Sequence, residues 1–446
     1  MKKWVRYIFI FLFMFCIVEF FGFSNTYGDS VNNYMFSHAI VMGEIPYLDF
    51  NMVSTPLYAF IMSLGLFLWD NYLMFALEQS LLLTIAFYLL YEVYGKKSYI
   101  ALLSVCLFAF FAFNATYNFL ALFFLIFLIY LEEKFPHKDY FIGFVLGCVI
   151  LSKQTVGVML VIPTLIFYLR DIRKILRRIV GAFIPCFIFL IYLLFQHALY
   201  SFFDLCLFGL FDFSSKNGFH FSFYFLFSIL LFCIQLWITL KRKKDIKNYY
   251  LLMGVSFVIP LFDLHHFSLY IFCFVLQLLP FITKYEDYFG RLALVLSIIV
   301  SIFIFSYLSY LLKPVFSTKI PKFQYTLNSS YDYQRALDNF KFFDKFERKL
   351  ILSYGSTQYM VQYDISRDYP ITYFDVLMYG NYGYRGSYKM IERVKEMEDV
   401  YILVDMASYH DFSLYNQFDK VVADYVIKHY KNCLLYTSPS PRDPKT

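Results

Sequence analysis

The chain has 446 residues, of which 60% are hydrophobic, 23% aromatic and only 16% charged. This composition excludes a soluble globular protein, because a chain of this length could not bury so much apolar surface in one core. The formal net charge of +6 is a weak indication of nucleic-acid binding, since the excess lies in short loops between apolar segments, where Lys and Arg set membrane topology.

The first apolar segment covers residues 7–23 and follows Lys2, Lys3 and Arg6. No small-x-small cleavage site follows it, so we predict an uncleaved first transmembrane helix and not a signal peptide. Its basic end faces the cytoplasm, which places residues 24–71 in a first outer loop. Within this loop, residues 56–69 form an apolar stretch that is short for a span and typical of an interfacial or re-entrant helix.

The later apolar segments predict transmembrane helices at roughly 72–94, 98–113, 119–131, 140–151, 156–169, 179–195, 221–240, 249–262, 267–283 and 292–312. If the short stretch does not cross, nineteen Lys and Arg residues before residue 313 face the cytoplasm, and only Lys153 and Lys216 face outward. If it crossed, this bias would reverse, so the positive-inside rule favours about eleven spans. The basic runs RDIRKILRR and KRKKDIK are interpreted as topology signals only. We therefore predict that residues 1–312 form an all-α polytopic bundle in the cytoplasmic (plasma) membrane.

Residues 313–432 have a different character, with more polar residues and tyrosines. Strand-like runs at 350–354, 371–374 and 400–404 alternate with helix-like stretches such as 388–397, which predicts a small α/β domain. The same topology makes this domain extracytoplasmic. Residues 433–446 begin with CLLYTSPSPRD, which resembles a translated sequencing adapter. We exclude them from fold reasoning and expect a different natural continuation after Asn432.

Polar residues near the membrane spans gather on the outer face in this topology. Polar groups are costly there, so they are candidates for function. Plainer interpretations exist, because an outer-loop carboxylate is usually solvated, a lone lysine at a helix end snorkels to the interface, and a His pair at a helix end is often interfacial. Co-location on one side of the bundle favours function. The candidates are Asp29 and Asp49 in the first outer loop, Lys153 and Gln154 in LSKQTVG, and Asp263 and His266 in PLFDLHHF.

Two stretches of the first outer loop, AIVMGEIPYLDF (39–50) and STPLY (54–58), resemble the GT-C class of membrane glycosyltransferases. They are closest to the branch related to protein O-mannosyltransferases and lipid A aminoarabinose transferases. The LSKQTVG segment and the D-x-x-H segment that starts at Asp263 also resemble bacterial members. Thr55 stands where the family usually has a proline, and Asp29 is followed by Ser30 where the family usually has a second acid.

This resemblance implies transfer of a sugar from a polyprenyl-phosphate-linked donor to an envelope glycan, lipid or protein acceptor outside the cytoplasmic membrane. Asp29 would be the catalytic base, with Asp49 as second choice, because a carboxylate can accept the proton of the attacking hydroxyl. The leaving lipid phosphate needs a nearby cation. A divalent metal could replace or assist the protein's own cations, although no cofactor is certain. The groups expected around the phosphate are Lys153 and His266, oriented by Gln154 and Asp263.

Two other functions stay open from the sequence. An O-antigen-type polysaccharide polymerase or ligase also uses lipid-linked sugars outside, but usually through a large outer loop in the later half, whereas here the longest internal outer loop is the first. A lipid or polysaccharide transporter often has internal repeats and broken helices near mid-membrane, and neither is evident in the sequence. No nucleotide-binding motif is evident either, which agrees with a lipid-linked donor.

Overall fold

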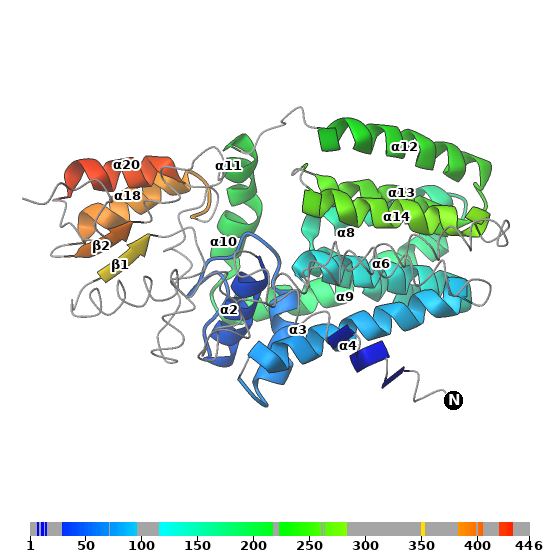
Figure 1. Cartoon of the computed structure of the whole chain (residues 1–446), viewed down its shortest axis with the longest axis horizontal. Coiled ribbons are helices and arrows are strands. Elements are labelled where there is room, and N and C mark those ends of the chain that lie inside the picture. Colours follow the sequence, from blue (N-terminus) through cyan, green and yellow to red (C-terminus); the bar gives the residue numbers. More distant parts are fainter. Residues whose placement is uncertain are drawn as a thin grey trace, which may run out of the picture.

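The computed structural model describes residues 7–8, 10–12, 14–15, 29–70, 72–95, 116–216, 223–259, 262, 264–282, 349–352, 382–397, 400–404 and 419–430. Within these residues the chain is mostly helical (Figure 1), as the sequence predicted. Three of the helical segments are long and apolar enough to cross a membrane, namely Leu73–Tyr94, Ile172–Phe195 and Phe223–Lys241. Their length and composition support membrane association. The count of about eleven spans stays a prediction.

The first described helices are α2 (Asp29–Val41), α3 (Leu57–Leu66) and α4 (Tyr72–Leu90), which continues into a π-helical turn, η1 (Tyr91–Gly95). Helix α3 falls within the apolar stretch 56–69 and is held against α4 near both of its ends. The Tyr58 hydroxyl accepts a hydrogen bond from Gln79 Nε2 at 3.0 Å, and the Gly65 N–H donates to Glu78 Oε1 at 2.7 Å. Both contacts fall on one turn of α4, so the ten-residue α3 lies across the longer helix.

Four helices follow, each reversing the direction of the one before it: α6 (Tyr117–Lys134), α7 (Asp139–Ser152), α8 (Gln154–Phe167) and α9 (Ile172–Phe195). The backbones of α7 and α9 approach closely at two glycines. A Cβ atom on Gly143 would lie 2.1 Å from Arg178 O, and one on Gly181 would lie 2.1 Å from Tyr140 O. Close approach at small residues is a common way to pack apolar helices that gain little from excluding water.

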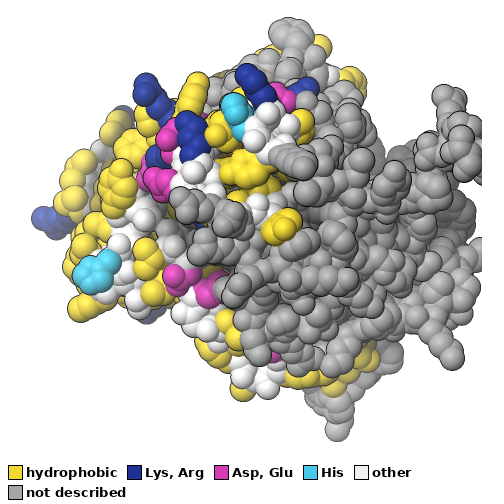
Figure 2. All heavy atoms as spheres, turned by 90° about the vertical axis from the view of Figure 1, so that its left-hand side faces the viewer, with side chains coloured by type: hydrophobic (Ala, Val, Ile, Leu, Met, Phe, Trp, Pro, Cys, Tyr) yellow, Lys and Arg dark blue, Asp and Glu magenta, His cyan; other side chains and the backbone are white. Residues whose placement is uncertain are grey.

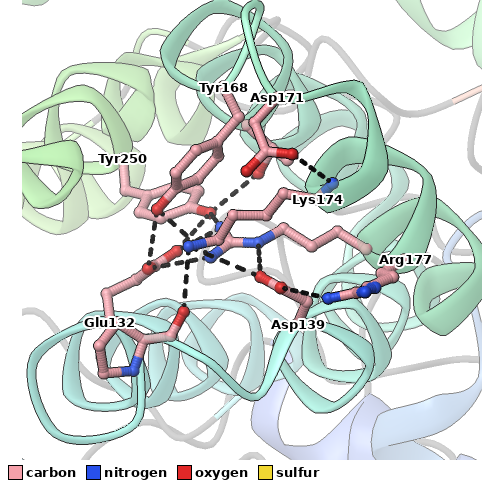
Figure 3. A network of polar contacts seen from close by, with 10 residues as sticks. Glu132, Asp139, Tyr168, Asp171, Lys174, Arg177 and Tyr250 are labelled. Atoms are coloured by element: carbon pink, nitrogen blue, oxygen red, sulfur yellow. Dashed lines mark hydrogen bonds and ion pairs between the residues drawn. The ribbon is translucent and has the colours of Figure 1, made fainter.

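A buried polar network joins one end of all four helices (Figure 3). Arg178 at the start of α9 bonds Glu132 at the end of α6 and Asp139 at the start of α7, and its Nη2 lies 3.4 Å from the Tyr168 hydroxyl after α8. The chain must therefore reverse between α7 and α8, which places Lys153 at the opposite end. Because Arg178 is fully buried in this network, it does more than mark topology, and our interpretation of the run RDIRKILRR as a topology signal only was wrong for this residue.

A kinked connection then leads into the last described helices of the bundle. The connection consists of α10 (Leu199–Phe202), the π-helix η2 (Phe203–Phe208) and α11 (Gly209–Lys216). Helix α12 (Phe223–Lys241) and helix α14 (Leu264–Ile282) match the predicted spans 221–240 and 267–283. They are joined by a polar contact, in which Gln277 Nε2 donates to Thr239 Oγ1 at 2.9 Å.

The predicted span 249–262 is not one continuous helix. The chain forms α13 (Ile246–Leu252) and then the tighter 3₁₀-helix η3 (Met253–Val258). Ile259 is extended, with φ −96° and ψ 129°. Proline disfavours the helical conformation of the residue before it, and Pro260 follows Ile259, so the helix ends here for a local steric reason.

The C-terminal elements lie at the left of Figure 1, beside α10 and α11. Strands β1 (Lys349–Leu352) and β2 (Tyr401–Val404) pair in parallel, with Lys349 opposite Tyr401. Helices α18 (Gly386–Glu396) and α20 (Lys420–His429) pack on each other. These elements match three of the predicted segments, while 371–374 lies outside the described residues. A separate α/β domain over 313–432 stays a prediction, since most of that range also lies outside them.

Candidate functional site

Lys153 forms the turn between α7 and α8, where its extended backbone (φ −149°, ψ 104°) interrupts the helix. The residue is 8% exposed. Its Nζ donates to the carbonyl oxygen of Phe257 at 3.3 Å and lies 5.8 Å from the centroid of the Phe257 ring. A lysine that snorkels would hold its ammonium in water, whereas this ammonium is held inside the bundle by η3. The geometry therefore favours a cation kept within the protein.

Gln154 connects the same turn to two other parts of the chain. Its Nε2 donates to the carbonyl oxygen of Val53 at 3.2 Å and to the carbonyl oxygen of Cys206 at 3.3 Å. The Thr55 hydroxyl donates to the carbonyl oxygen of Ile150 at 3.3 Å, one helical turn before Gln154. The first outer loop thus packs directly on the LSKQTVG segment, so two stretches about a hundred residues apart in sequence meet in space.

The stretch from Pro46 to Ser54 is a tight turn with its own hydrogen bonds. Tyr47 has a left-handed backbone (φ 70°), and its buried hydroxyl donates to the carbonyl oxygen of Ser54 at 2.7 Å. Burial, with a further contribution from Cys206, raises the pKa of Tyr47 well above its usual range, so its hydroxyl stays protonated. Asp49 Oδ2 accepts from the Ile45 N–H at 2.7 Å. Asp49 is exposed and closes this turn, which is a structural role.

The other candidates are placed only in part. Asp29 is the first residue of α2, and its side chain lies outside the described residues. Asp263 lies outside them altogether. His266 is in the first turn of α14 and is 7% exposed. The structure thus brings Lys153, Gln154 and the first outer loop together, whereas the positions proposed for Asp29 and Asp263 stay predictions.

A cluster that the sequence analysis missed joins α2 to the connection between α3 and α4. His38 Nδ1 lies 2.9 Å from Asp70 Oδ2, and the Tyr34 hydroxyl donates to Asp70 Oδ1 at 3.2 Å. Tyr34 and His38 are four residues apart on α2, with ring centroids 6.2 Å apart. The sequence could have indicated only that Tyr34 and His38 share one face of a helix. It gives no indication that Asp70, which lies just before α4, is their partner. A carboxylate paired with an imidazole can fix the orientation of the ring.

A metal site remains as open as the sequence left it. Among the residues that the structure describes, no group of three or more His, Cys, Asp or Glu side chains could hold a metal ion. The side chains of Asp29, Asp263 and His265 are not in that set.

Comparison with known proteins adds nothing to these observations. No family model matches the chain, and neither the curated proteins nor the solved structures contain a match. A function for the chain must therefore be argued from its own residues and their contacts.

Proposed function

We propose that the protein is a membrane glycosyltransferase that moves a sugar from a polyprenyl-phosphate-linked donor to an acceptor on the outer face of the cytoplasmic membrane. The observation that carries this proposal is the contact of the first outer loop with the LSKQTVG turn, through Gln154 to Val53 and Thr55 to Ile150. Thr55 and Gln154 belong to stretches that resemble the GT-C class, and Val53 and Ile150 are each next to one of these stretches. The contacts therefore make the two stretches neighbours, as a shared active site requires.

In the proposed reaction, the acceptor hydroxyl oxygen attacks the anomeric carbon of the donor sugar. The new bond from carbon to acceptor oxygen forms as the bond from carbon to phosphate oxygen breaks, so the anomeric centre is inverted. Asp29 takes the proton of the hydroxyl as general base. Asp49 is the second choice for this role, and its hydrogen bond to the Ile45 N–H would have to coexist with proton transfer.

The lipid phosphate leaves with its electron pair and needs positive charge nearby. We assign this task to Lys153 and His266. An ammonium group has three donors, so the bond from Lys153 to Phe257 is compatible with a second bond to a phosphate oxygen. Gln154 holds the turn that carries Lys153 in place, and Asp263 is proposed to orient His266. A divalent metal could share the charge of the phosphate.

The bundle gives a reason for a lipid-linked donor. Apolar helices can hold a prenyl chain, which would bring the phosphate to the outer interface. In this proposal, about eleven spans leave the C-terminus outside, and residues 313–432 form an extracytoplasmic α/β domain next to the site. The acceptor is an envelope glycan, lipid or protein.

Two measurements test the proposal. The purified protein in lipid should transfer sugar from synthetic polyprenyl-phosphate-sugars to envelope extract, and mass spectrometry of envelope glycans from cells with and without the gene should reveal the missing sugar. A change only in chain length would favour a polymerase or ligase. If the protein moved labelled lipid-linked sugar across spheroplast membranes without any transfer, the transporter would replace the transferase.

A further inference from the structure

The turn before α18 docks on the connection between α9 and α12. Asp204 in η2 accepts a hydrogen bond from the Tyr384 N–H at 3.1 Å and forms an ion pair with Lys389 of α18. Asp212 in α11 accepts from the Gly386 N–H at 3.2 Å. Residues about 180 positions apart in sequence thus form a polar interface with both backbone and side-chain contacts.

The backbone around the start of α18 is shaped to fit against Asp204 and Asp212. The residue that caps α18 is Arg385, which has a left-handed backbone and makes no side-chain capping bond. The N–H groups at the start of a helix need acceptors and attract negative charge. Asp212 accepts from the first of them, at Gly386, and Asp204 accepts from the Tyr384 N–H just before the helix. Gly383 has φ +79°, and a Cβ atom there would lie 2.3 Å from Asp204 Oδ2, so a larger residue would strain the turn and displace the Asp204 carboxylate.

The ion pair of this interface is partly exposed. Figure 2 looks at the left-hand side of Figure 1 and shows Lys and Arg side chains beside Asp and Glu side chains on the described surface. The side chain of Asp204 is 17% exposed and that of Lys389 is 46% exposed. Because water reaches the ion pair, its contribution is moderate, and removing one partner should not unfold the protein.

The other side of the same π-helix reaches the candidate site. Cys206, two residues after Asp204, is fully buried, and both its carbonyl oxygen and its Sγ accept from Gln154 Nε2, at 3.3 and 3.6 Å. Gln154 in turn holds Val53 of the first outer loop. Cys206 is thus the acceptor that ties η2 to the Lys153 turn.

We infer that Asp204 is a positioning residue, which links docking of the C-terminal elements to the placement of Gln154 and the first outer loop. This inference rests on the proposed function. Docking at Asp204 fixes η2, and η2 fixes the carbonyl of Cys206. The cation of Lys153, the residue next to Gln154, then stands at a defined distance from the first outer loop. Without the docking contact, the same groups are present but are held less accurately, and small misplacements of reacting groups are costly in rate.

The test compares three variants of the full chain in lipid. Asp204→Ala removes both contacts, Asp204→Asn keeps an acceptor for the Tyr384 N–H but removes the ion pair, and Glu392→Ala is the control. Glu392 forms an exposed ion pair with Lys395 of the same helix. Hydrogen exchange is measured at the first amides of α18 and at the first amides of α8, and transfer kinetics are measured with a polyprenyl-phosphate-sugar.

We expect Asp204→Ala to speed exchange at both places and to lower kcat by about tenfold to a hundredfold, with little change in KM for the donor. Asp204→Asn should lie between Asp204→Ala and the control, which keeps the test valid if the alanine variant folds poorly. Faster exchange at α18 alone, with α8 and kcat equal to the control, would overturn the inference. If the unaltered protein transfers no sugar, the proposed function fails, while the exchange at α8 still decides whether Asp204 is linked to the Gln154 turn.

Discussion

The guanidinium of Arg178 bonds the carboxylate of Glu132 with both terminal nitrogens, and its Nη2 lies 3.1 Å from Glu132 Oε2 (Figure 3). Arg178 Nε also donates to Asp139 Oδ1 at 3.1 Å, and the side chain of Arg178 has no exposed surface. A charge in such a position is tolerated only while its partners are present, because isolated buried charge is strongly unfavourable. One pair of residues thus holds the ends of α6 and α9 together.

Replacing Arg178 by Ala should therefore lower the free energy of unfolding by about 3–5 kcal/mol, because the buried Glu132 loses its cation and Asp139 loses the nearest of its cations. Arg178→Lys keeps a charge but cannot form the two-pronged contact, so it should have an intermediate effect. Unfolding of the detergent-solubilised protein measures both. Arg177→Ala is the control, since Arg177 is 54% exposed and lies 4.0 Å from Asp139. Equal stability of the Arg177 and Arg178 alanine variants would contradict a stabilising network.

The pair of His38 and Asp70 is expected to be structural. His38→Phe keeps an aromatic ring next to Tyr34 but removes the contact with Asp70, and it should cost about 1–3 kcal/mol because the Asp70 carboxylate loses a partner. Tyr34→Phe, which removes only one hydroxyl, should cost less. Thermal unfolding compares the two. If His38→Phe abolished sugar transfer while the melting temperature stayed unchanged, His38 would belong to the proton-transfer chemistry instead.

Apolar runs and charged loops predicted much of the bundle. Helices α4, α9 and α12 follow from long apolar segments that each have a basic loop at one end, and the reversal at Lys153 was expected between spans 140–151 and 156–169. The end of the helical run at Val258 was missed, because a span was drawn through 249–262 although Pro260 stood in it.

The partners of the site residues could not be predicted at all. Gln154 is recognisable as a polar residue between apolar segments. One of its acceptors is the backbone carbonyl of Cys206, and every residue has such a carbonyl, so the sequence cannot identify this partner. The same holds for Lys153 and the carbonyl of Phe257. Contacts of this kind depend on how distant segments pack, so local patterns identify the polar residue and leave its partner unknown.

Reporter fusions test the topology. Before residue 313, nineteen Lys and Arg residues are expected inside and two outside. This bias predicts which fusion points lie in the cytoplasm, because basic loops are retained there. Each fusion point is tested with two reporters, a phosphatase that is active only outside the cytoplasm and a protein that fluoresces only inside it. A cytoplasmic signal after residue 322 would overturn the eleven-span arrangement and the outward site. Cytoplasmic fusions are expected after Lys97, Arg178 and Lys247, and outer fusions after Ser30, Phe213 and Lys322.

Lys153 and His266 are expected to act on the leaving phosphate. Lys153→Ala and His266→Ala should lower kcat, by about a hundredfold to a thousandfold for a group that stabilises charge in the transition state, with a smaller change in KM for the donor. Lys153→Arg keeps a cation and should recover part of the rate. Lys138→Ala, at the exposed opposite end of α7, is the control. Unchanged kinetics in both alanine variants would leave Lys153 and His266 with structural roles only.

Asp29→Asn tests the proposed base. Asparagine has nearly the size of aspartate and can also begin a helix, so α2 should persist when its first residue is changed. The loss of one negative charge in the first turn costs less than about 1 kcal/mol, which should leave the amount of folded protein nearly constant. The amide cannot accept the proton of the acceptor hydroxyl. Transfer should therefore fall by roughly a hundredfold to ten-thousandfold, the usual contribution of a general base, while donor binding changes little.

Asp49→Asn is the matched comparison, because both aspartates belong to the first outer loop. An asparagine oxygen can still accept from the Ile45 N–H, so the turn that Asp49 closes should survive and the rate should fall far less than in Asp29→Asn. A large loss at Asp49 with none at Asp29 would move the base to Asp49. Near-normal transfer in both variants would remove the carboxylate base from the first outer loop. The proton of the acceptor hydroxyl would then need another acceptor, and the polymerase and transporter alternatives would gain support.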